Sequence, residues 1–129
     1  MSFILVVDDN HITRRALVSL LRLDGHRADG LTDGGELISF LDSHDPHLVV
    51  LDVMMPKVHG LEALRMIRAD ARRSRLPVLL YTALDDDAIR EEARRLGVAD
   101  YILKGMRWPE LRERIERHLP EPDAVPEPA

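Results

Sequence analysis

Cysteine is absent from this 129-residue sequence, so disulfide bonds, thiolate chemistry and cysteine-based zinc sites are excluded. Aromatic residues are also scarce, at 4% of a chain that is 45% hydrophobic, so its core must be aliphatic. Long hydrophobic runs are missing as well. The apolar start, residues 3–7, has no basic leader and is too short for a signal peptide core or a membrane span. We therefore expect a soluble, cytoplasmic protein with no membrane partner.

Neither sign of charge dominates the chain. The net charge is −5, but three of the 23 acidic residues lie in the last ten positions, which leaves 20 acidic against 18 basic residues. This balance argues against a nucleic-acid-binding chain, and we expect no direct nucleic-acid binding. Residues 120–129 also hold four of the eight prolines. We predict one folded domain over residues 1–119 and a tail or linker over residues 120–129.

Strand-like and helix-like segments alternate five times. Apolar runs predict strands over residues 3–7, 48–51, 77–81 and 100–103, and residues 26–29, which have few apolar side chains, suit a strand at a sheet edge. Helical spacing predicts helices over residues 12–23, 34–43, 60–71, 88–96 and 109–119, and the first of these is expected to bury Ile12, Ala16, Leu17, Leu20 and Leu21. Such alternation is typical of an α/β domain with a parallel sheet covered by helices on both faces. Right-handed crossovers favour the doubly wound, flavodoxin-like strand order 2-1-3-4-5.

Polar side chains follow four of these strands at the points where the strands end. They are Asp8, Asp9, Asp52, Thr82 and Lys104. In the predicted strand order these ends border one crevice, which is where ligands bind in open parallel sheets. Three carboxylates in one cleft would repel one another unless a cation lies between them. Each residue alone could merely cap a turn, but that explanation is weak for the whole set.

A magnesium ion suits such a crevice, because Mg²⁺ takes oxygen ligands and is usually held by one or two carboxylates with phosphate oxygens. Lys104 cannot bind the metal, but its flexible point charge suits a phosphate oxygen. Thr82 offers a hydroxyl donor to the same group. A carboxylate nucleophile, a metal, a lysine and a hydroxyl together indicate a phosphoryl-transfer site.

The chain resembles the receiver domain of bacterial two-component response regulators over about residues 2–119. The matching segments are VVDDN (6–10), LVVLDVMMPKVHG (48–60), PVLLYTA (77–83) and GVADYILK (97–104). The resemblance implies that a histidine kinase or phosphotransfer protein phosphorylates Asp52. It also implies that Asp8 and Asp9 hold Mg²⁺ with Asp52 and the backbone carbonyl of Met54. The phosphoryl group is then lost by self-dephosphorylation.

Further roles follow from the same resemblance. Thr82 and Lys104 would contact the phosphoryl group, and Tyr101 matches the aromatic position whose side chain turns inward in the active state. An output partner would bind the face formed by the fourth helix, fifth strand and fifth helix. Met54 and Leu84 match the positions that flank the approach of water to the acyl phosphate. Because both are apolar, we hypothesise that they shield the acyl phosphate and slow its hydrolysis.

Two departures from the family's pattern concern loops. Receivers usually follow the lysine with proline through a cis peptide bond, whereas this chain has Lys104-Gly105. A cis bond before a non-proline residue costs about 2.5–4 kcal/mol, so we expect a trans bond or a different loop path. His59 stands before Gly60, where an acidic or small polar residue is commoner, and we interpret it as a surface change.

Two other functions would use part of this pattern. A magnesium-dependent phosphatase of the haloacid-dehalogenase type also has an aspartate nucleophile, but it needs a second aspartate two positions later, where this chain has Met54. A non-phosphorylated interaction module with the same fold would not need the acidic residues, all of which are present.

Two further groups of residues have simpler explanations. His44 and His47 have the spacing of half a metal site, but Pro46 between them indicates a turn. The arginines of two predicted helices favour a solvated face, with a partner-binding surface as the alternative. They are Arg90, Arg94, Arg95, Arg112, Arg114 and Arg117.

Overall fold

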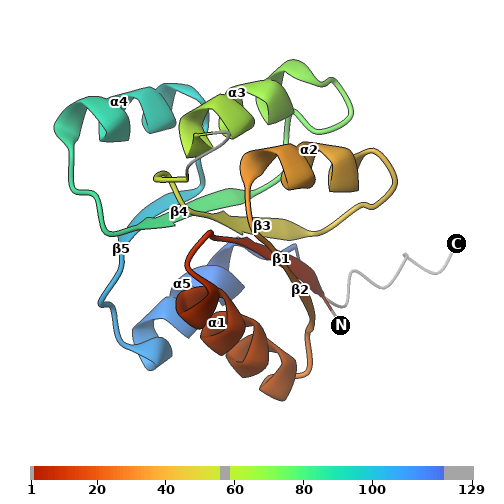
Figure 1. Ribbon diagram of the computed structural model, residues 1–129, viewed down its shortest axis with the longest axis vertical. Helices are drawn as coiled ribbons and strands as arrows, with labels where there is room; N and C mark the ends of the chain where they lie inside the picture. Colours follow the sequence, from red (N-terminus) through yellow and green to blue (C-terminus); the bar gives the residue numbers. More distant parts are fainter. Residues whose placement is uncertain (1, 56–58, 121–129) are drawn as a thin grey trace, which may run out of the picture.

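The computed structural model describes residues 2–55 and 59–120, in which five strands alternate with five helices (Figure 1). The strands are β1 (Phe3–Val7), β2 (Arg27–Leu31), β3 (Leu48–Leu51), β4 (Val78–Thr82) and β5 (Asp100–Leu103). The helices are α1 (His11–Leu23), α2 (Gly34–Leu41), α3 (Gly60–Ala69), α4 (Asp87–Arg95) and α5 (Trp108–His118). Both the number and the order of the elements agree with the prediction.

The five strands form one parallel sheet in the predicted order β2-β1-β3-β4-β5. Helices α2, α3 and α4 cover one face and α1 and α5 cover the other (Figure 1). The register pairs Val7 with Leu51, Leu51 with Leu80, and Thr82 with Leu103. This register aligns the carboxyl ends of β1, β3, β4 and β5 at one edge, so the residues that follow these strands are neighbours.

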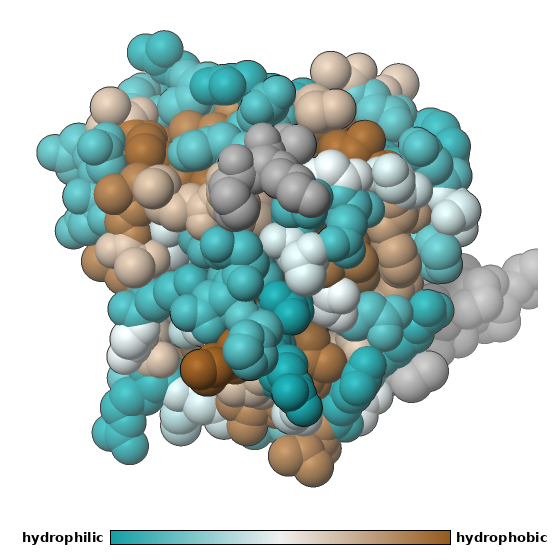
Figure 2. Space-filling model, in the orientation of Figure 1, coloured by the Kyte–Doolittle hydropathy of each residue, from teal (hydrophilic) through white to brown (hydrophobic). Residues whose placement is uncertain are grey.

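The core is aliphatic apart from Phe3 and lies in two layers, one on each side of the sheet. Strand β3 belongs to both layers: Val49 and Leu51 pack beneath α2 and α3, while Leu48 and Val50 pack toward α1 and α5. Burial of such a side chain contributes about 1.5–3 kcal/mol relative to an exposed one. The visible surface is mostly hydrophilic, with apolar side chains in separate patches rather than one broad band (Figure 2).

The buried face of α1 differs from the prediction. Leu17, Val18 and Leu21 are buried, whereas Ile12 is 72% exposed and Ala16 is exposed. The early turns of α1 border an open hollow of about 300 Å³ between this helix and the start of α5. Helical spacing shows which residues share a stripe, but the tertiary structure decides how far along the helix that stripe is covered.

Element ends also shifted where tertiary contacts or side-chain hydrogen bonds determine them. Strand β2 runs later than predicted because it pairs residue by residue with the whole of β1. Helix α3 ends at Ala69, and the Asp70 side chain then accepts a hydrogen bond from the Arg72 amide, which favours a turn. Helix α4 begins after Asp86, whose carboxylate accepts a hydrogen bond from the Ile89 amide.

The chain around α5 bears on two predictions. No peptide bond in the described residues is cis, so the Lys104–Gly105 bond is trans as expected, and Gly105 has a φ of +106°. Residues 121–129 of the predicted tail lie outside the described part of the chain, so the division after residue 119 stays a prediction. Within residues 2–55 and 59–120, no helix is long and apolar enough to cross a membrane.

Candidate functional site

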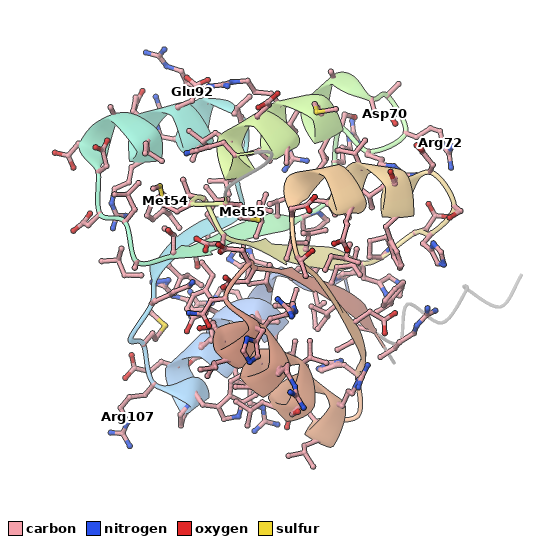
Figure 3. The ribbon with its side chains drawn as sticks, in the orientation of Figure 1. Met54, Met55, Asp70, Arg72, Glu92 and Arg107 are labelled. Atoms are coloured by element: carbon pink, nitrogen blue, oxygen red, sulfur yellow. The ribbon has the colours of Figure 1, made fainter. Side chains whose placement is uncertain are left out.

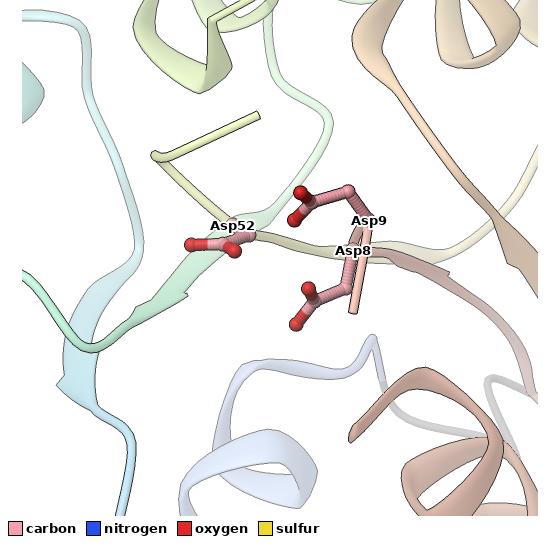
Figure 4. A group of neighbouring side chains, drawn as sticks. All are labelled: Asp8, Asp9 and Asp52. Atoms are coloured by element: carbon pink, nitrogen blue, oxygen red, sulfur yellow. The ribbon is translucent and has the colours of Figure 1, made fainter. Parts of the chain in front are cut away.

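Three carboxylates meet at the carboxyl ends of β1 and β3 (Figure 4). Asp8 and Asp9 follow β1, and Asp52 follows β3. One carboxylate oxygen from each residue lies within 4.8 Å of the others. Asp8 and Asp52 are buried, whereas Asp9 is exposed, so the cluster is open to solvent on the Asp9 side.

Lys104 reaches this cluster from the end of β5. Its Nζ lies 2.9 Å from Asp8 Oδ2 and 3.2 Å from Asp52 Oδ2. Burial raises the pKa of Asp8 despite the hydrogen bond from Lys104, and the Asp52 charge acts in the same direction. Burial alone would lower the pKa of Lys104, but the two carboxylates outweigh it and raise that pKa. One lysine therefore leaves the three carboxylates short of positive charge.

The loop after β1 is held by its own side chains. Asp8 Oδ1 accepts a hydrogen bond of 2.9 Å from the Asn10 amide, and Asn10 caps the first turn of α1. Arg14 Nη1 donates to the Asp8 carbonyl at 2.7 Å. The stem of Arg14 packs over Gly30, where a Cβ would come within 2.9 Å of Arg14 Cγ. Sequence reasoning missed Arg14, because its partner is a backbone carbonyl that no motif marks.

The backbone that carries Asp52 packs directly against the start of α3. Asp52 Oδ1 accepts a hydrogen bond of 3.3 Å from the Met54 amide, while the Met54 side chain is about half exposed (Figure 3). A Cβ on Gly60 would lie 2.2 Å from the Asp52 carbonyl oxygen and 2.7 Å from Val53 Cα. Only glycine fits there. The sequence placed Gly60 at a helix start but held no signal for this close approach.

Thr82 and Tyr101 are connected through Leu84. Thr82 is fully buried, and its Oγ1 accepts a hydrogen bond of 3.2 Å from the Leu84 amide. The Tyr101 hydroxyl donates to the Leu84 carbonyl at 2.5 Å, and the Arg90 guanidinium lies 4.3 Å from the centre of the Tyr101 ring. The Lys104 amide also donates to the Thr82 carbonyl at 2.8 Å. The ends of β4 and β5 are thereby held together beside the acidic cluster.

The histidines outside this cluster have structural contacts. His47 Nδ1 accepts a hydrogen bond of 2.8 Å from the Phe3 amide, and His44 stacks on Phe40, which agrees with a turn rather than a metal site. His59 is partly exposed, which agrees with its interpretation as a surface change, but it also has a local structural role. His59 Nδ1 accepts a hydrogen bond from the Leu61 amide and caps α3, so its ring completes the first turn of that helix.

The six arginines of α4 and α5 all pair with carboxylates. Arg90 pairs with Asp85 at 2.9 Å and Arg94 pairs with Glu91 at 2.6 Å. Arg114 contacts Asp100 at 3.0 Å. Arg95, Arg112 and Arg117 also have carboxylate partners. This pairing favours the interpretation of these arginines as part of a solvated face rather than a partner-binding surface.

Comparison with known proteins assigns the family. The model of the response regulator receiver domain matches residues 4–116 of this chain. The chain belongs to the response regulator receiver domain family. As a receiver domain of two-component regulatory systems, it is a signalling domain, and its architecture is consistent with phosphorylation-switched signalling. This assignment disfavours the phosphatase of the haloacid-dehalogenase type.

Individual relatives agree with this assignment. The receiver domain is 39% identical over 116 residues to the probable transcriptional regulator ycf27 of Cyanophora paradoxa, covering 90% of this chain and 47% of the relative. It is 31% identical over 104 residues to the protein PilH of Pseudomonas aeruginosa, covering 81% of this chain and 86% of PilH. The chain thus spans about half of ycf27 and most of PilH.

A solved structure shares the fold. The response regulator protein TrrA of Thermotoga maritima, in complex with Mg²⁺-BeF, superposes with a TM-score of 0.81 and 30% sequence identity. The match covers 92% of this chain and 100% of TrrA. The receiver fold is therefore retained at low sequence identity.

Proposed function

We propose that this receiver domain accepts a phosphoryl group from a histidine kinase or phosphotransfer protein onto Asp52, with Mg²⁺, and that it promotes hydrolysis of the resulting acyl phosphate. The observation that carries the proposal is the setting of Asp52. Its carboxylate is buried, is bound by Lys104, and lies beside the carboxylates of Asp8 and Asp9. The cytoplasmic location expected from the sequence is part of this proposal.

The donor set fits a hard divalent cation. Three carboxylates supply oxygen ligands, and the single Lys104 charge does not neutralise them. Burial raises the pKa of Asp8, and the neighbouring Asp52 charge acts in the same direction. Asp8, Asp9, Asp52 and the Met54 carbonyl would hold the ion. When bound, Mg²⁺ would offset the charge on the phosphoryl oxygens. The Mg²⁺-BeF complex of TrrA supports the same assignment.

The side chains at this edge can perform the transfer. A carboxylate oxygen of Asp52 attacks phosphorus, and the bond from phosphorus to the donor's imidazole nitrogen breaks, with that nitrogen keeping the electron pair. Lys104 Nζ already lies between Asp52 and Asp8, so it can bind a phosphoryl oxygen. Thr82 Oγ1 accepts from the Leu84 amide, which leaves its own proton free to donate to the same group.

The contacts of Thr82 could transmit a change at the acidic cluster to the surface of the domain. A Thr82 hydroxyl drawn toward the phosphoryl group would strain its hydrogen bond with the Leu84 amide, and Leu84 in turn holds the Tyr101 hydroxyl. Tyr101 lies in β5, and the guanidinium of Arg90, from α4, lies over the Tyr101 ring. We therefore place the output partner on the face formed by α4, β5 and α5.

Hydrolysis returns the domain to its starting state. Water attacks phosphorus opposite the Asp52 oxygen, the bond between phosphorus and that oxygen breaks, and inorganic phosphate leaves with the Asp52 carboxylate regenerated. The side chains of Met54 and Leu84 cannot orient this water by hydrogen bonds. We expect them to slow the reaction.

Phosphorylation with acetyl phosphate and Mg²⁺ tests this proposal. Intact-mass spectrometry should show one added phosphoryl group on the wild type and none on Asp52→Asn. An exposed carboxylate at the end of α2 offers a matched control, since Asp42→Asn should be modified like the wild type. Equal modification of Asp52→Asn would refute the assignment. Rapid turnover of a small phosphate ester without phosphoprotein would favour the phosphatase.

A further inference from the structure

Within the part of the chain that the structure describes, several arginines without a carboxylate partner lie at the edge of the sheet opposite the acidic cluster. Arg73 pairs with Asp45, and Arg65 pairs with Glu92. In the described part of the chain, no carboxylate lies within ion-pair distance of Arg68, Arg72 or Arg75. These three come from α3 and the loop that leads to β4.

A hollow of about 510 Å³ lies at this edge and is lined by basic groups. Within residues 2–55 and 59–120, Arg68, Arg75, Arg95 and His118 line it, and no carboxylate does. Its volume falls in the range of small-molecule sites, which is about 300–1,000 Å³. The side chains come from α3, the loop before β4, α4 and α5, so only the folded domain assembles the hollow.

Arg68 lies at the wall of this hollow and forms no ion pair with any carboxylate of the described residues. Its guanidinium donates to the backbone carbonyls of Leu96 at 2.7 Å, Leu76 at 2.8 Å, Gly97 at 3.1 Å and Arg73 at 3.4 Å, which leaves one N–H on Nη2 for a ligand. Burial lowers the pKa of this guanidinium. An anion in the hollow would supply the negative charge that the carbonyl dipoles provide only in part.

The other basic groups are also available to an anion. Arg95 lies 3.5 Å from Glu91 Oε1, but Arg94 binds the same oxygen at 2.6 Å. His118 similarly shares Asp100 with Arg114. An incoming anion at these groups would therefore compete only with carboxylates that already have a second cation.

The remaining walls of the hollow are largely apolar. Leu76, Pro77, Leu96 and Ala99 line it together with the basic groups. Arginine forks match phosphate oxygens in a bidentate manner, and apolar walls suit an organic ring. The combination selects a ligand with a phosphate at one end and an apolar or planar body at the other.

We propose that this hollow binds a small organic phosphate of nucleotide size, with its phosphate on Arg68, Arg75 and Arg95 and its body on Leu76 and Pro77. The site lies at the amino-terminal edge of the sheet, away from Asp52, and uses none of the residues of the acidic cluster. It is a second binding site and does not depend on the phosphorylation proposed for Asp52.

Titration calorimetry of the full chain without Mg²⁺, using adenosine 5′-monophosphate as the probe, tests the proposal. We expect saturable binding of one equivalent. Adenosine, which lacks the phosphate, should bind at least about tenfold more weakly, or about 1.4 kcal/mol. The amide signals of Gly97 and Ala99 in NMR spectra should shift with the probe, which would place it in the hollow.

Matched variants separate this site from general attraction of anions. Arg75→Gln with Arg95→Gln should weaken binding of adenosine 5′-monophosphate at least about tenfold. Arg15→Gln with Arg107→Gln removes the same charge from exposed positions outside the hollow and should leave binding unchanged. Arg107 lies far from Arg72, which belongs to the loop between α3 and β4 at the edge of the sheet with the hollow (Figure 3). Arg68 is left intact because its contacts with backbone carbonyls support the fold.

Several outcomes would overturn the proposal. They are an absence of saturable binding, equal affinity for adenosine, or equal losses in both double variants. A short oligonucleotide whose binding depends equally on Arg15 and Arg107 would indicate general electrostatic attraction. Asp52→Asn should bind the probe like the wild type, so failure at this hollow and failure of phosphorylation at Asp52 can be told apart.

Discussion

The two edges of the sheet handle charge in opposite ways. At the carboxyl edge, three carboxylates cluster beside one lysine, which contacts two of them, and all four residues lie within two positions of a strand end. At the amino edge, arginines from helices and a loop line a hollow, and Arg68 donates hydrogen bonds to backbone carbonyls but pairs with no carboxylate of the described residues. Among the described residues, carboxylates outnumber the one lysine in the first cluster, whereas only basic and neutral residues line the hollow at the second edge. One edge therefore suits a cation and a transferred phosphoryl group, while the other suits an anion.

The difference also shows what makes a site visible in a sequence. Asp8, Asp52 and Lys104 stand at the ends of apolar runs, so their meeting follows once the strand order is known. Arg68 and Arg95 lie in helices whose ends happen to meet, and nothing in a helical pattern marks such a meeting. Variants that damage one edge should leave the other intact.

The largest effect should come from Gly60→Ala at the acidic edge. The new Cβ would overlap the Asp52 carbonyl oxygen, which is backbone and cannot move aside. We expect the free energy of unfolding to fall by about 2–4 kcal/mol and phosphorylation by acetyl phosphate to slow at least about tenfold. Alanine is otherwise favoured over glycine in helices, so a loss would identify the clash.

Gly30→Ala is the control for this variant, because the Cβ there would meet only the flexible side chain of Arg14. Its cost should stay below about 1 kcal/mol. Chemical denaturation and intact-mass time courses measure both variants. Equal stability of the two would mean that α3 can shift away from Asp52 freely.

Arg68→Met, at the edge with the basic hollow, should lower the free energy of unfolding by almost as much as Gly60→Ala. Methionine keeps much of the apolar stem but leaves the carbonyls of Leu76 and Leu96 without their donor. The free energy of unfolding should fall by about 2–3 kcal/mol, while the rate of Asp52 phosphorylation in the folded protein stays unchanged. Arg72→Met, at an exposed position, should change stability by no more than about 0.5 kcal/mol. A phosphorylation defect in Arg68→Met would show that the edges are coupled.

A smaller effect is expected for Asp9→Asn. This change removes one of three neighbouring negative charges without touching the contacts of Lys104 with Asp8 and Asp52. Mg²⁺ affinity should fall at least about tenfold, while the metal-free protein becomes slightly more stable. Calorimetry and thermal unfolding with and without Mg²⁺ measure the two effects. His11→Gln is the comparator and should bind Mg²⁺ normally. An unchanged affinity in Asp9→Asn contradicts the proposed metal site.

The smallest effect concerns the lifetime of the phosphorylated state. Met54→Asn combined with Leu84→Glu introduces groups that can orient water near Asp52, so the acyl phosphate should decay a few times faster, roughly two- to tenfold. Decay is followed after removal of the donor, with Mg²⁺ held constant. Met66→Asn, at an exposed position of α3, should decay like the wild type. If the double variant decays no faster than the wild type, shielding does not set the lifetime.

How closely a predicted element matched the structure depended on how its ends are determined. Strand β5 agrees to the residue with the predicted 100–103, because Asp100 and Lys104 bound a short apolar run. Strand β2, with only Ala28 buried and few apolar residues, took its position from pairing with β1. The exposure of Ile12 similarly depends on where α5 begins relative to α1. Local pattern is sufficient only where the local residues decide the boundary.

By itself, the sequence determined the class of fold, the strand order and the set of residues at the carboxyl edge. Alternating apolar runs and polar strand ends are local features of the sequence. The right-handedness of the crossovers then favours one strand order. Only the tertiary structure revealed Gly60 against the Asp52 backbone, Arg14 on the Asp8 carbonyl, and Arg68 on the end of α4. The physical reason is that each of these contacts ends on the backbone. Every residue has the same backbone carbonyl. The pattern of side chains in a sequence therefore does not indicate which carbonyl a distant residue will contact.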